Sequence, residues 1–172
     1  EEALAGARDI IAEMVSENTE ARTKMRHHFM QKATYKTILV KGKEEAGIKY
    51  KDYFEWEESA KTAPSHRVLA MLRGEQEGFL KLNVLPPDEP AVELLENQFI
   101  TARNASADQV QLVIADGYKR LLRPAMETEL RATIKQKADE EAIKVFAENA
   151  RQLLLAAPMG QKNVLAIDPG FR

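Results

Sequence analysis

The sequence contains no cysteine, which excludes disulfide bonds, thiolate catalysis and thiolate-bound metal sites among its 172 residues. It has no run near the roughly 20 apolar residues that a membrane span needs, and it opens on EEALAGARDI, which is acidic where a signal peptide is basic. A net charge of -2 leaves no global positive field to attract nucleic acid. It also lacks an initiating methionine, so we expect a piece of a longer cytoplasmic protein with no membrane partner.

Residues 1–33 carry apolar side chains at the spacing of two amphipathic helices, in a chain that is 44% apolar and 30% charged. The stretch EEALAGARDIIAEMVSEN predicts the first helix. Asn18 or Thr19 can cap the second, because both residue types accept hydrogen bonds from the free N–H groups of a first turn. The apolar residues of the second helix recur every four positions and are expected to be buried: Ala21, Met25, Phe29 and Ala33.

Two short runs have the composition of strands. KTILVKGK, at residues 36–43, is β-branched, and FLKLNVL, at Phe79–Leu85, alternates apolar and polar positions. We expect these runs to pair as a small two-stranded ribbon. Between them, TAPSHRVLAMLRGEQEG predicts a helix with Pro64 in its first turn and Gly78 just past its end.

One long helical pattern dominates the second half of the chain. After a helix that begins near Pro90, apolar residues recur at helical spacing from Ser106 to Ala157. Ser106 and Gln109 have the spacing of a capping box, and Pro124 should kink or divide the helix because proline removes a backbone donor. A single helix cannot bury its own apolar stripe, so the shorter helices or a neighbouring domain must cover it.

These elements define a mainly α fold class: a multi-helix scaffold with one long, proline-kinked helix and a small β ribbon. We expect four regions: N-terminal helices at 1–35, a small α/β lobe at 36–88, a helical scaffold at 89–160 and a strand at 161–172. The last region, QKNVLAIDPGFR, is an apolar strand that delivers Asp168 to a turn, because Pro169 and Gly170 follow it.

Two basic faces are candidate nucleic-acid contacts. Lys24 and Arg26 lie in ARTKMRHH, and Arg67 and Arg73 lie in SHRVLAMLR, where His66 shares a helix face with Arg73. Lysine and arginine contact phosphates without needing a fixed register. An ordinary solvated face, or packing against acidic neighbours, is the alternative for both segments.

The other candidates for chemistry are few. His27 and His28 point about 100° apart on a helix, so they do not form the i, i+4 pair that grips a metal. The aromatic residues of KYKDYFEWEE interleave with lysines and either stack bases or form the core of a small lobe. The acids at 139–141 fan outward as a solvated run. Asp168, at the end of an apolar strand, occupies the kind of position that holds a first metal-binding carboxylate, or it caps its own turn.

Three segments carry a resemblance to a known family: PSHRVLAMLRGEQEGFLKL, ELRATIKQKADEEAIKVFAENARQLLLAAP and VLAIDPGFR. In this order and spacing the chain resembles the bacterial transcription accessory protein Tex family over essentially its whole length. The resemblance implies a multidomain cytoplasmic protein with a helix-turn-helix region, a helical scaffold, a ribonuclease H-like domain of YqgF type, helix-hairpin-helix motifs and an RNA-binding OB-fold.

By this resemblance the chain is the helical middle of such a protein, and VLAIDPGFR begins the YqgF-type domain. Asp168 then matches the first acidic position of that domain, whose partner acids would lie after Arg172. The family is thought to lack a complete nuclease set, so we expect a non-enzymatic scaffold without metal or cofactor. Its partners would be RNA or DNA, bound mainly by other domains, together with the transcription machinery. The alternatives are a fragment of a metal-dependent nuclease and a protein-interaction scaffold.

Overall fold

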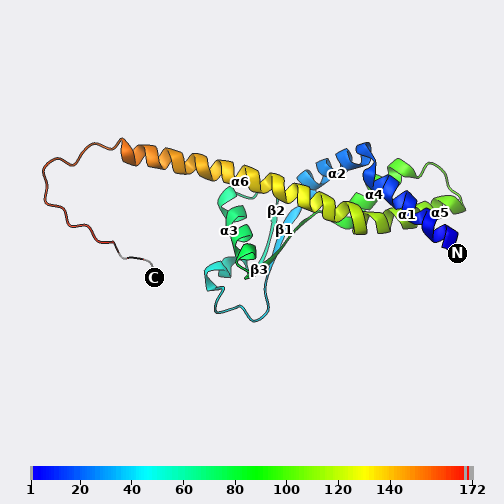
Figure 1. The fold of residues 1–172 in the computed structure, drawn as a ribbon, viewed down its shortest axis with the longest axis horizontal. Coiled ribbons are helices and arrows are strands. Elements are labelled where there is room, and N and C mark those ends of the chain that lie inside the picture. The colour runs from blue at the N-terminus through cyan, green and yellow to red at the C-terminus, as the bar shows by residue number, and fades with distance from the viewer. Residues whose placement is uncertain (1, 169, 171–172) are drawn as a thin grey trace.

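The computed structural model describes residues 2–168 and 170, and its helices and strands run over most of that length (Figure 1). In chain order the elements are α1 (Glu2–Glu17), α2 (Thr19–Lys32), β1 (Thr34–Leu39), η1 (Ile48–Tyr53), β2 (Glu55–Ser59), α3 (Ser65–Gln76), β3 (Leu80–Leu85), α4 (Asp88–Phe99), α5 (Ala105–Gly117), η2 (Tyr118–Leu122) and α6 (Arg123–Leu154). The expected mainly α fold class is confirmed. The boundaries of the four expected regions stay a prediction.

The two N-terminal helices form where the apolar periodicity places them. The Asn18 side chain caps α2 by accepting a hydrogen bond from the N–H of Ala21 at 2.9 Å, which confirms the first of the two expected caps. The four residues expected to form the buried face of α2 and its end are all almost inaccessible to solvent: Ala21, Met25, Phe29 and Ala33.

The β structure is a three-stranded antiparallel sheet in the order β2-β1-β3. The expected pairing of the two runs is confirmed, because β1 pairs with β3 and places Tyr35 opposite Val84. The expectation of only two strands is wrong: EWEES forms β2, whose Trp56 pairs with Thr37 on the other side of β1. One face of the sheet is buried beneath α3 and α6, and the other face is exposed.

The edge of β3 is covered by side chains of α6 rather than by another strand. The N–H of Val84 donates to a carboxylate oxygen of Glu127 at 3.0 Å. The carbonyl of Leu82 accepts from the Arg131 guanidinium at 2.9 Å. Two backbone groups that an edge strand leaves free are thereby satisfied, and the long helix is fixed to the sheet.

The expected long helix consists of two α-helices joined by one π-helical segment. The segment η2 lies directly before Pro124, which occupies the first turn of α6, so the expected interruption near this proline is confirmed. The expected capping box at Ser106 is wrong. Asn104 caps α5 instead, accepting from the N–H of Ala107 at 2.9 Å, while the Gln109 side chain is bound by Arg8 of α1.

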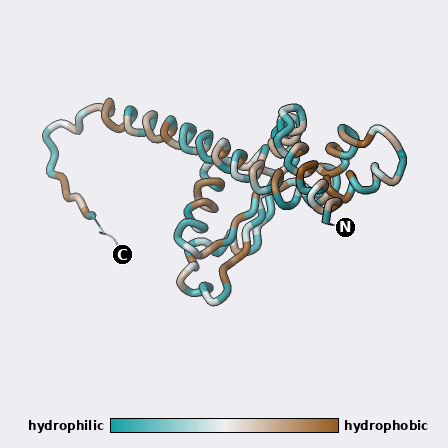
Figure 2. Tube along the Cα trace, turned by 45° about the vertical axis from the view of Figure 1, so that its right-hand side comes forward, coloured by the Kyte–Doolittle hydropathy of each residue, from teal (hydrophilic) through white to brown (hydrophobic). Residues whose placement is uncertain are grey.

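A single cluster of buried side chains joins these elements. Its largest fully buried members are Tyr35, Tyr118, Phe29, Met25, Met71, Leu95, Ile114, Leu122, Met126 and Val84. In α6 this core ends at Ala138, although the helix continues for four more turns or so to Leu154. Figure 2 shows that the projecting end of α6 still alternates apolar and polar residues, and that the tail after it contains an apolar stretch.

The expected C-terminal strand at 161–172 does not form within its described part. Residues 162–168 have no regular secondary structure, and Leu165 and Ile167 are 88% and 82% exposed. A lone extended segment has no neighbour with which to exchange backbone hydrogen bonds, so apolar composition alone does not make it a strand. The expected positions of Pro169, Phe171 and Arg172 in that strand lie outside the described residues.

Candidate interaction surfaces

The basic face of α2 is neutralised by acids of its own helix and of α6. Arg26 and Arg22 both bind the carboxylate of Glu129, at 2.6 and 2.5 Å, and Lys24 binds Glu20 at 2.7 Å. The hydrogen bond from Arg26, assisted by that from Arg22, lowers the pKa of Glu129. Of the two candidate contacts here, Arg26 therefore joins α2 to α6, and Lys24 forms a pair within its own helix.

Arg67 on α3 is also held by its neighbours. Its guanidinium binds Glu58 of β2 at 2.6 Å and lies 5.7 Å from the centre of the Trp56 ring. Burial, together with the nearby Glu58 carboxylate, raises the pKa of Tyr35 to about 12. Arg67 is thus a tie between α3 and the sheet, so its charge is already matched.

Arg73 differs from the other candidate arginines because no ion pair forms with it among the described residues. Its exposed side chain lines a groove of about 1050 Å³ between α3 and α6. His66, seven residues earlier on the same face of α3, lines the same groove. The structure therefore brings His66 and Arg73 together as the spacing of seven residues predicts, and it excludes Arg67 from their group.

We call this hollow the α3–α6 groove. Its apolar lining comes from both helices and includes Leu69, Leu72, Ala142, Val145 and Phe146. Val145 and Phe146 are 61% and 73% exposed, far more than a core side chain. Between the helices the groove is bridged at one point by a contact from the Ser65 hydroxyl to the Glu141 carboxylate.

The polar lining of the groove comes from both ends of α3, with Ser65 and His66 at its start and Arg73 and Gln76 near its end. Lys49 binds Glu77 at 2.6 Å, and Lys135 binds Asp139 one turn along α6. These two lysines have partners, whereas Arg73 forms no ion pair within the residues the structure describes, although its charge helps to lower the pKa of nearby Glu77.

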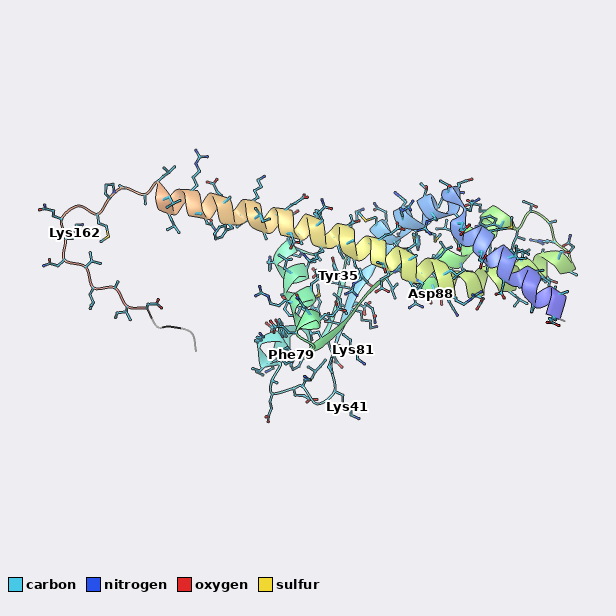
Figure 3. The ribbon with its side chains drawn as sticks, in the orientation of Figure 1. Tyr35, Lys41, Phe79, Lys81, Asp88 and Lys162 are labelled. Atoms are coloured by element: carbon cyan, nitrogen blue, oxygen red, sulfur yellow. The ribbon has the colours of Figure 1, made fainter. Side chains whose placement is uncertain are left out.

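The aromatic cluster of the small lobe belongs to its packing. Tyr50 is buried against Phe79, with ring centres 5.9 Å apart, and Tyr53 contacts Trp56 edge to face at 6.0 Å. The Lys49 ammonium lies 5.1 Å from the centre of the Tyr50 ring. Figure 3 places Phe79 with Lys41 and Lys81 at the end of the lobe remote from α6. The core alternative is therefore the better description of KYKDYFEWEE.

His27, His28 and Asp168 interact only with residues close to them in the sequence in the contacts described here. Burial lowers the pKa of His28, and neighbouring Lys32 and His27 add to the effect. Asp168 is exposed, and its carboxylate accepts a hydrogen bond from the N–H of Gly170 at 2.9 Å, as a turn aspartate does. Across residues 2–168, no three histidine or acidic side chains converge in a group that could hold a metal ion.

The sequence that forms this groove and sheet resembles that of known proteins. Residues 1–146 match the family described as Tex central region-like. The chain belongs to this family. It is 43% identical over 175 residues to the protein YdcI of Bacillus subtilis, covering 100% of this chain and 24% of that protein.

Two further relatives of the Tex central region extend the comparison. The transcriptional accessory protein Tex of Neisseria gonorrhoeae is 38% identical over 176 residues, covering 99% of this chain and 23% of Tex. The human S1 RNA-binding domain-containing protein 1 is 25% identical over 180 residues, covering 97% of this chain and 18% of that protein. The chain thus spans about a quarter, or less, of the length of these relatives.

In the part of the chain that the structure describes, no helix combines the length and the apolar composition needed to cross a bilayer. The longest, α6, carries charged residues throughout its 32 positions.

The sequence pattern identified the basic residues of this surface. It did not identify the groove, nor the acidic residues that form ion pairs with Arg26 and Arg67. Glu129 lies about a hundred positions from Arg26, and no local pattern links them. The signal for the groove was present, since Ala142 and Phe146 continue the apolar spacing of α6 beyond the point where the shorter helices can cover it.

Proposed function

We propose that this chain is a non-enzymatic helical scaffold within a Tex-like transcription accessory protein that binds nucleic acid in its full-length form. The observation that carries the proposal is the uneven burial of α6. Met126, Leu130 and Ala138 lie in the core, whereas Phe146 and Leu153 are 73% and 78% exposed. The first part of α6 is held in the core, whereas its second part exposes apolar side chains. Such a helix connects its own core to another domain that covers those side chains.

The names of the relatives support the nucleic-acid part of this proposal. The Neisseria protein is called a transcriptional accessory protein and the human protein carries an S1 RNA-binding domain in its name. We infer that this chain serves a protein of the same kind, works in the cytoplasm, and leaves most nucleic-acid contacts to domains outside residues 1–172. The transcription machinery is a further expected partner.

A second part of the proposal concerns the segment Val164–Ile167, which we infer is the first strand of an RNase H-like domain of YqgF type. Four consecutive residues of an apolar segment that are exposed on both sides gain stability once neighbouring strands cover them. The nuclease alternative requires further carboxylates beside Asp168. Among the described residues no group of histidine and acidic side chains that could hold a metal ion includes Asp168. We therefore propose that residues 1–172 alone catalyse no hydrolysis.

Binding to labelled single- and double-stranded DNA and RNA tests the proposal, with this chain and a chain of the relatives' length measured side by side. We expect the longer chain to bind at least about ten times more tightly. The 172-residue chain should bind weakly, with a slope of log affinity against log salt near -0.9 for each phosphate contacted on duplex DNA. Equal affinity of the two chains would show that the scaffold itself is the nucleic-acid-binding part and would contradict the proposal.

The contribution of the basic faces is tested by one variant and a matched control. Arg73→Gln removes a cation that forms no ion pair among the described residues, whereas Lys24→Gln removes one that is paired within its helix. If Arg73 contacts phosphate, its loss should reduce the salt slope by about 0.9 and the control should change it less. Identical slopes in both variants would mean that Arg73 has another partner.

A further inference from the structure

We propose that the α3–α6 groove is the docking site for the folded unit that begins with Val164–Ile167 in the same polypeptide. This inference rests on the scaffold function proposed above and adds the surface and the partner. The groove and the segment both expose apolar side chains to solvent. Contact between the groove and the unit that contains the segment would bury apolar surface on both sides.

The relatives give a reason to place the partner in the same polypeptide. This chain spans 23–24% of the Bacillus and Neisseria proteins, so proteins of this family carry several times more sequence than the groove-forming region. An apolar groove next to the connection with a following unit is covered by that unit at high effective concentration, without any encounter in solution.

The connection is long enough to reverse direction and reach the groove. The ten residues from Leu155 to Val164 span at most about 33 Å when extended. From Phe146 to Leu154 the helix rises only about 12 Å along α6. Gly160 has a φ of 70°, in the left-handed region that permits a sharp turn. Figure 1 shows the tail turning back on the side of α6 where α3 lies.

The charge at the groove specifies the partner further. Arg73 is the cation at the groove end that lacks an ion pair within the described part of the chain, and His66 lies on the same face of α3. A surface that fits here is apolar in its centre and carries a carboxylate at the edge that meets Arg73. The docking unit should therefore present an acidic residue at that edge.

Thiol accessibility tests the inference, since the chain contains no cysteine of its own. Phe146→Cys and Asn149→Cys place probes in the groove, and Lys144→Cys is the matched control. Lys144 is exposed and stands two positions from Phe146, about 200° around the helix. Leu165→Cys reports on the segment itself. Each variant is alkylated in the 172-residue chain and in a chain of the relatives' length whose later cysteines are replaced.

In the longer chain we expect both groove probes to react at least about tenfold more slowly than in the 172-residue chain, because docking hides them. The control should change less than about twofold. Adding Arg73→Glu should restore fast labelling of the groove probes in the longer chain while Leu165→Cys stays protected, since the unit folds but no longer docks.

Each other outcome has a definite meaning. If Leu165→Cys is protected and the groove probes react freely, the following unit folds but docks elsewhere, and the inference fails while the proposed function stands. If all probes react freely in the longer chain, both fail. Protection in the 172-residue chain that rises with protein concentration would identify a second copy as the occupant and would overturn the inference.

Discussion

Replacing Arg131 with methionine separates the attachment of α6 to the sheet from the rest of the fold. The side chain is about one-quarter exposed, donates to the carbonyl of Leu82 at 2.9 Å and contacts the carboxylate of Glu75 on α3. Methionine keeps the aliphatic stem and its packing but has no donor. Arg131→Met therefore removes one charged hydrogen bond to the sheet edge and one partly exposed ion pair, together with a weak contact to Glu127 at 3.9 Å.

The magnitude follows from those two contacts. A hydrogen bond from a charged donor contributes about 1.5–3 kcal/mol, and a partly exposed ion pair adds about 0.5 kcal/mol. We expect the free energy of unfolding to fall by about 2–3.5 kcal/mol. For a chain of this length each kcal/mol lowers the melting temperature by about 2–4 °C, so the expected loss is about 4–14 °C.

Urea unfolding followed by far-ultraviolet circular dichroism measures the difference. The denaturant dependence should keep its slope while the midpoint falls, because the surface exposed on unfolding hardly changes. Lys137→Met is the control, since Lys137 is an exposed residue of the same helix, and it should stay within about 0.5 kcal/mol of the parent. If Arg131→Met is no less stable than this control, the sheet edge is not held by α6 and the reasoning above is wrong.

Four shorter predictions test other parts of the structure. Lys135→Pro should destabilise α6 by about 3 kcal/mol or more, because proline in a helix interior removes a hydrogen bond and clashes with the preceding turn, and an unchanged melting temperature would contradict a continuous helix. The lowered pKa of Glu129 means that its bonds to arginine stabilise the fold above the unfolded pKa, near 4.5. That stability should be lost as the pH falls through the lower folded pKa. In Glu129→Gln the free energy of unfolding should therefore depend less on pH in the acid range than it does in the parent. Asn18→Ala should cost about 1 kcal/mol in thermal melts, whereas Thr19→Ala, beside the cap, should cost clearly less. The 172-residue chain should hydrolyse neither nucleic acid nor ATP with Mg²⁺ or Mn²⁺, and turnover that disappears in Asp168→Ala would refute this.

The sequence predicted the elements whose signals are local. Helix α2 was predicted with its cap and its buried residues, because a side-chain cap and a repeat of four are both read within one helix. The pairing of β1 with β3 followed from the β-branched composition of the first run and the apolar–polar alternation of the second. The capping box at Ser106 failed because Asn104 lay two residues earlier and Gln109 had a partner on α1, a contact that spans a hundred positions.

The third strand and the site were harder for the same reason. EWEES is too acidic to read as a strand by composition, and it forms β2 because β1 offers a partner and because Arg67 neutralises Glu58. The cations of the candidate site were visible, but their partners were not. Arg26 and Arg67 became structural ties through acids on other elements, which left Arg73 exposed in the groove.

The buried residues of α6 follow a spacing of four, and this spacing has a rotational consequence. In a helix of 3.6 residues per turn, each step of four advances the stripe by about 40°. From Met126 through Leu130 to Ala138 the stripe therefore turns by about 120°, a third of the way around the helix. Because the stripe turns, α2 and the sheet lobe contact α6 on different sides, as Figure 1 shows. Deleting one residue of this stretch would turn everything after it by about 100°. The number of residues in this stretch of α6 therefore sets the angle between the elements that pack against the helix before it and those that pack after it.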